Sequence, residues 1–130
     1  MKQSALLTTA SLLTILFMTL HLAGDILFQM SPPGFLNLFA VFVFVVQLYG
    51  TLVLGGRRAG YIIIFLASVL AMLIPVIHMK GTRGVIGGDI GTSSQAFLFV
   101  WTILALATTS TFSVILSASA LLSLPWRRSR

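Results

Sequence analysis

The spacing of charged residues is the feature that most limits what this chain can fold into. Asp, Glu, Lys and Arg are all missing from four stretches, residues 3–24, 26–56, 59–79 and 90–126. Each stretch is at least as long as the roughly 20 residues with which an α-helix crosses the hydrocarbon of a bilayer. The pattern predicts an all-α integral membrane protein with transmembrane helices near 5–23, 35–54, 61–79 and 96–122.

Composition supports the same class of protein. The 130 residues are 58% hydrophobic and 8% charged, whereas an ordinary soluble domain has roughly 25% charged residues. A chain of this length is expected to form a single membrane domain over residues 1–130, with the lipid bilayer as its surroundings. The formal net charge of +6 does not indicate nucleic-acid binding, because the basic residues lie at segment ends and form no stripe. The absence of cysteine excludes disulfides, thiolate zinc sites and iron–sulfur clusters.

Residues with turn chemistry separate the predicted helices. The sequence Ser-Pro-Pro-Gly at 31–34 cannot continue a helix, and Gly-Gly-Arg-Arg at 55–58 is typical of a short polar turn. Short turns make neighbouring helices antiparallel, so the expected architecture is a four-transmembrane-helix antiparallel bundle. The third connection, 80–95, is the longest and contains five glycines, which marks it as the candidate functional loop.

The basic residues predict the orientation of the bundle in the membrane, since cytoplasmic loops are enriched in Lys and Arg. In a four-span chain two basic residues, Lys80 and Arg83, lie on one side. Six lie on the other side: Lys2, Arg57, Arg58, Arg127, Arg128 and Arg130. Both termini are therefore expected in the cytoplasm.

The first apolar segment also has features of a signal peptide, because Lys2 precedes it and Ala23 and Gly24 are small residues that can end one. Cleavage would leave three helices and an external amino terminus. His21 stands two residues before Ala23, where a cleavage site requires a small side chain. We therefore expect the first helix to be retained.

All histidines and acidic residues of the chain fall on the predicted outer face. Asp25 follows His21 by four residues, so the two share a helical face if the first helix extends that far. His78 ends the third segment, and Asp89 lies in the glycine-rich connection. These four residues are the candidate outer-face site.

Several chemistries fit this candidate site. The simplest interpretation is that the four residues are ordinary interfacial polar groups and that no cofactor is bound. Imidazole and carboxylate groups also suit a divalent metal ion, and with Lys80 and Arg83 they suit a proton relay or an anion-binding patch. A further alternative is haem, for which two histidines on different helices can supply the axial ligands.

The fourth segment is rich in small and hydroxyl-bearing residues that favour close helix packing. Residues spaced by four form a predicted packing face toward the bundle or a partner subunit: Ala105, Thr109, Ser113 and Ser117. Gln47 is the most polar side chain deep in a span, and its amide is expected to bond to another helix.

These features lead to three interpretations of function. The first is a non-enzymatic accessory or interaction subunit of a membrane complex, with other membrane subunits or further copies of the chain as partners. The second is a metal- or haem-binding redox protein that uses His21 and His78. The third is a small-molecule carrier that works as an oligomer, because no charged residue lies inside the spans to couple transport in a single chain.

Overall fold

The computed structural model describes residues 3–28, 34–78 and 94–124, and the side chains of all of these except 94–96. Within these residues the regular structure consists of helices: α1 (Ala5–Leu27), α2 (Phe35–Leu52), α3 (Arg58–His78) and α4 (Ser94–Ser123). All four are long and apolar enough to cross a membrane. The prediction of four long apolar helices is confirmed.

The helix boundaries differ from the predicted ones by a few residues. The most important difference is at α1, which continues past 23 to Leu27 because a single glycine, Gly24, weakens a helix without ending it. At its other end α1 is capped by Ser4, whose hydroxyl accepts a hydrogen bond from the Leu7 amide at 3.2 Å. The extension places Asp25 on the same helix as His21.

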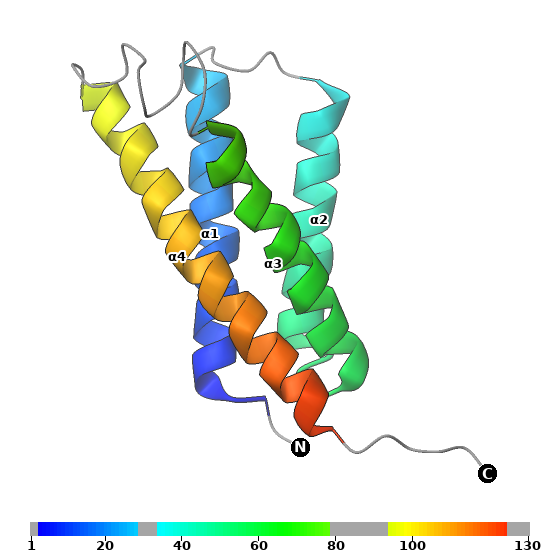
Figure 1. Cartoon of the computed structure of the whole chain (residues 1–130). Coiled ribbons are helices and arrows are strands. Elements are labelled where there is room, and N and C mark those ends of the chain that lie inside the picture. The colour runs from blue at the N-terminus through cyan, green and yellow to red at the C-terminus, as the bar shows by residue number, and fades with distance from the viewer. Residues whose placement is uncertain (1–2, 29–33, 79–93, 125–130) are drawn as a thin grey trace.

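Figure 1 shows how the helices are arranged. In this view α1 begins and α4 ends at the lower end of the bundle, where the turn between α2 and α3 also lies. The end of α3 and the beginning of α4 lie at the upper end, near the end of α1. α4 packs against α1 and α3, and α2 packs against the other side of the same two helices.

The interior contains many polar side chains, while the outer surface carries large hydrophobic ones. Residues as apolar as Phe35, Leu36 and Leu122 are exposed. The buried polar or charged residues among those described are Ser11, Thr14, His21, Asp25, Gln47, Thr51, Ser68, Thr102, Ser110, Ser113 and Ser117. This distribution is the reverse of the one expected for a soluble domain.

Hydrogen bonds between helices satisfy part of this buried polarity. The Gln47 amide of α2 donates to the Ser11 hydroxyl of α1 at 3.1 Å, and the hydroxyls of Ser11 and Thr51 lie 2.8 Å apart. The bond from Gln47 to another helix agrees with the expectation from the sequence. On the other side of α1, the hydroxyls of Thr14 and Ser113 lie 3.2 Å apart and join α1 to α4.

The inward face of α4 differs in part from the predicted packing face. Ser113 and Ser117 are buried as expected, but Ala105 and Thr109 are only half-buried. The buried line continues instead through Ser110 and Leu106. A strict spacing of four drifts around a helix that has 3.6 residues per turn, whereas alternating steps of three and four stay on one face.

Candidate functional site

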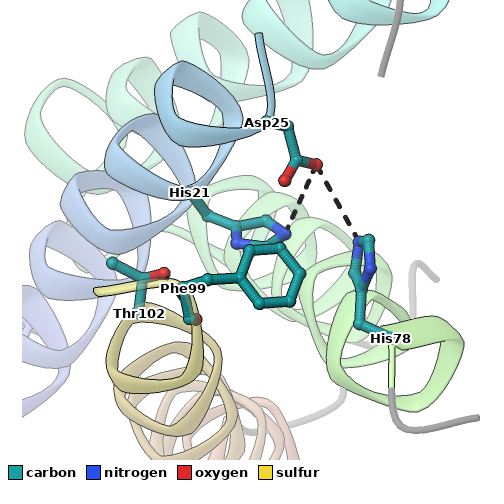
Figure 2. A network of polar contacts seen from close by, with 5 residues as sticks. All are labelled: His21, Asp25, His78, Phe99 and Thr102. Carbon is teal, nitrogen blue, oxygen red and sulfur yellow. Dashed lines mark hydrogen bonds and ion pairs between the residues drawn. The ribbon is translucent and has the colours of Figure 1, made fainter. Parts of the chain in front are cut away.

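The upper end of the bundle brings together three of the four candidate site residues (Figure 2). His21 and Asp25 lie one turn apart on α1, and His78 is the last residue of α3. Asp89, the fourth candidate, lies outside the described residues, as do Lys80 and Arg83. The site that follows consists of His21, Asp25 and His78.

One carboxylate oxygen faces both imidazole rings. Asp25 Oδ2 lies 3.6 Å from His21 Nε2 and 3.9 Å from His78 Nε2. Hydrogen bonds between N–H and oxygen are shorter, about 2.7–3.2 Å, so these groups are close without being hydrogen-bonded. The three residues each offer one ligand atom, and these atoms all lie within 4.8 Å of one another.

The site contains buried polar atoms without hydrogen-bond partners, and these atoms lower the stability of the folded protein. His21 is 4% exposed, and neither of its ring nitrogens has a hydrogen-bond partner among the described residues. The same is true of the second carboxylate oxygen, Asp25 Oδ1. Leaving a buried donor or acceptor unsatisfied costs about 1–3 kcal/mol. Native proteins rarely keep such groups without a ligand, an ion or ordered water to pair with them.

Helix α4 contributes an aromatic wall. The buried ring of Phe99 lies with its centroid 5.2 Å from that of His21 and 5.3 Å from that of His78. The ring is edge-on to His78, with an interplanar angle of 90°. Phe99 therefore holds both imidazole rings in place and gives the site an apolar flank.

Thr102 lies one turn further along α4 and is buried. Its hydroxyl donates a hydrogen bond to the Phe99 carbonyl at 2.9 Å, so the oxygen lone pairs remain free to accept one. Figure 2 shows this hydroxyl on the side of the His21 ring that carries Nδ1, away from Asp25. Nδ1 of His21 has no hydrogen-bond partner among the described residues, so the two groups are not bonded in this structure.

Two imidazoles and one carboxylate at these distances form a set of metal ligands. Zinc binds histidine nitrogen at about 2.0–2.1 Å and carboxylate oxygen at about 2.0–2.2 Å, which puts neighbouring ligand atoms of a tetrahedral site about 3.3–3.5 Å apart. The two nitrogen–oxygen distances exceed this by only a few tenths of an ångström. The three ligand atoms lie within 4.8 Å of one another, so the side chains have to rotate toward one another to bind one ion.

The sequence pattern pointed to His21, Asp25 and His78 but missed Phe99 and Thr102. Phe99 is one of ten phenylalanines in an apolar chain, and Thr102 is one of several hydroxyl residues in its helix, so neither carries a distinguishing signal. Comparison of the chain with protein-family models, curated proteins and solved structures gave no match.

Proposed function

We propose that this chain is a multi-pass membrane protein that binds one divalent transition-metal ion through His21, Asp25 and His78. In this proposal the four helices form an antiparallel bundle across the bilayer. The metal site lies near the outer face, and both termini are cytoplasmic.

The distribution of polarity supports membrane insertion. Leucine and phenylalanine side chains cover the outside of the bundle. Inside it, the hydroxyls of serine and threonine and the amide of Gln47 form hydrogen bonds with one another. Lipid does not compete for such hydrogen bonds, so polar groups inside a bilayer turn toward other helices. The basic pair Arg57 and Arg58 supports the orientation, because it lies at the end of the bundle opposite the histidines.

One observation carries the metal-binding proposal: three potential ligand atoms from two helices lie within 4.8 Å of one another in a place where their own hydrogen bonding is incomplete. Ionisable groups inside a membrane are expensive and are normally tied to a function. A bound ion would pair with His21 Nε2, Asp25 Oδ2 and His78 Nε2 at the same time.

The ligand set favours some metals over others. Imidazole with carboxylate suits zinc, manganese, iron, nickel or copper, whereas calcium and magnesium prefer a shell of oxygen atoms. Haem fits less well, because Asp25 and Phe99 occupy the space beside the two imidazole rings (Figure 2). An anion is disfavoured as the primary ligand, since it would approach the carboxylate of Asp25.

This proposal is compatible with a role as an accessory subunit, because a metal ion can hold a subunit in its folded form without catalysis. It also retains the redox alternative for iron or copper. No observation in the described residues specifically supports the carrier interpretation, which needs an oligomer.

Metal binding is tested by thermal unfolding of the purified protein in mild detergent, after treatment with a chelator and then with zinc, manganese or copper. An ion present at a hundredfold excess over its dissociation constant stabilises the folded state by about 2.7 kcal/mol. We expect His21→Ala, Asp25→Asn and His78→Ala each to remove this stabilisation.

Thr19→Ala is the matched control, because Thr19 lies on α1 two residues from His21, and its exposed hydroxyl donates a hydrogen bond to the Ile15 carbonyl of its own helix. This variant should respond to metal as the wild type does. If no ion raises the unfolding temperature of the wild type, or if all four variants respond alike, the proposal is wrong.

A further inference from the structure

We infer that the bound metal ion keeps one coordination position free of protein side chains, and that this position takes a small anion. The inference rests on the proposed metal binding and says what the site does beyond holding the ion. It follows from the number of ligands, the direction from which the site is reached, and the charge that the ligands leave unbalanced.

The chain has few side chains that can bind a transition-metal ion. The chain contains two histidines, two acidic residues and no cysteine, and the cluster uses both histidines and one of the acids. Zinc and related ions take at least four ligands, and sites with three protein ligands hold water or substrate at the remaining position. Asp25 presents a single oxygen, Oδ2, to both imidazoles, so it counts as one ligand in this arrangement.

Exposure indicates where the free position lies. The side chain of His78 is 27% exposed, that of Asp25 is 11% exposed and that of His21 is 4% exposed. His78 is therefore the member of the cluster that is most accessible to solvent, and His21 is the least accessible. Phe99 closes one flank of both imidazole rings, so a large ligand would meet its ring.

Charge decides the class of ligand. A divalent ion carries +2 and the Asp25 carboxylate carries −1, while metal-bound histidines are neutral, so the loaded site has a charge of +1. The Phe99 ring and the surrounding helices form a low-dielectric environment in which an unbalanced charge is costly. An anion at the free position neutralises it, and hydroxide from a bound water is the smallest such ligand.

The experiment uses Co²⁺ as the metal and azide as the anion, with the full chain in mild detergent. The visible d–d absorption of Co²⁺ reports the number and type of its ligands. We expect azide to change these bands with saturable, single-site dependence, because azide replaces bound water. Perchlorate at the same ionic strength should leave the bands unchanged, since it coordinates weakly. Benzoate should bind at least tenfold more weakly than azide, because its ring meets Phe99.

The outcomes separate the two proposals. If the protein gives no Co²⁺ spectrum that depends on His21 and His78, metal binding itself is wrong, and the inference falls with it. If Co²⁺ binds and azide has no effect, the coordination shell is closed and only the inference is overturned. The variant Asp89→Asn then identifies the cause: a response to azide in that variant alone means that Asp89 fills the fourth position.

Discussion

The imidazole rings of His21 and His78 lie on different helices and meet edge-on, with centroids 5.0 Å apart and an interplanar angle of 76°. The pair joins α1 to α3 at one end of the bundle, with Asp25 beside both rings. A change that rotates or shifts either helix therefore alters the geometry of all three side chains.

The first prediction concerns topology. Six basic residues on one side and two on the other predict that the histidine end lies outside. Reporters fused after Arg130 and in the 55–58 turn should be cytoplasmic, and a reporter near Gly88 should be external. A periplasmic or extracellular location for the 55–58 turn would invert the bundle and move the metal site to the inner face.

The second prediction concerns Thr102 as a positioning residue. When Nε2 of His21 binds an ion, Nδ1 carries the proton and needs an acceptor. The Thr102 hydroxyl lies on that side of the ring (Figure 2), and although it is not bonded to Nδ1 in this structure, we expect it to accept a hydrogen bond from Nδ1 when the ion is bound. Thr102→Val removes the acceptor with little change in volume, and metal affinity measured by calorimetry should fall about 10–100-fold. Thr102→Ser should retain most of the affinity. Equal affinity in the valine variant would limit Thr102 to its bond with the Phe99 carbonyl.

The third prediction concerns the contact between α2 and α3. A Cβ atom added at Gly50 would lie 2.6 Å from Ile63 Cγ2, and one added at Gly60 would collide with the Leu54 carbonyl oxygen. Gly50→Ala and Gly60→Ala should each lower the free energy of unfolding by about 1–3 kcal/mol, because the helices must separate.

Gly24→Ala is the control for this pair. Its added Cβ would meet only the Phe28 ring, at 3.8 Å, which is an ordinary contact. Alanine is the better helix former, so the control should be neutral or should gain up to about 1 kcal/mol. Thermal unfolding of the three variants in the same detergent compares them, and equal stability of all three would argue against close packing of α2 on α3.

The fourth prediction ranks substitutions on α4. Ser113 is fully buried against Thr14 of α1, so Ser113→Leu should overpack the interior and cost about 1–3 kcal/mol. Thr109 is half-buried, so Thr109→Leu should have a smaller effect. Thr111 is exposed, and Thr111→Leu should have almost none. A different order in thermal unfolding would mean that α4 presents another face to the bundle.

The sequence alone determined the number of helices and the grouping of the ionisable residues. A bilayer excludes charged side chains, so the charge-free stretches predicted the four long apolar helices. Alternating crossings predicted that every histidine and acid falls at one end, and the structure brings His21, Asp25 and His78 together there. The spacing of four between His21 and Asp25 also placed these two on one helical face. That placement required the first helix to extend as far as Asp25, and α1 does so because it ends at Leu27.

Only the tertiary structure decided which faces of the helices meet. His78 points toward α1, and Phe99 lies beside both histidines, because α3 and α4 adopt particular rotations about their axes. The rotation of α4 also explains why Leu106 and Ser110 are the buried residues of this helix, in place of the predicted Ala105 and Thr109. In a soluble helix an apolar stripe marks the inward face. Here apolar side chains occur on every face, so an apolar stripe does not mark the inward one. Close packing and interhelical hydrogen bonds determine it, as they do for helices packed in lipid.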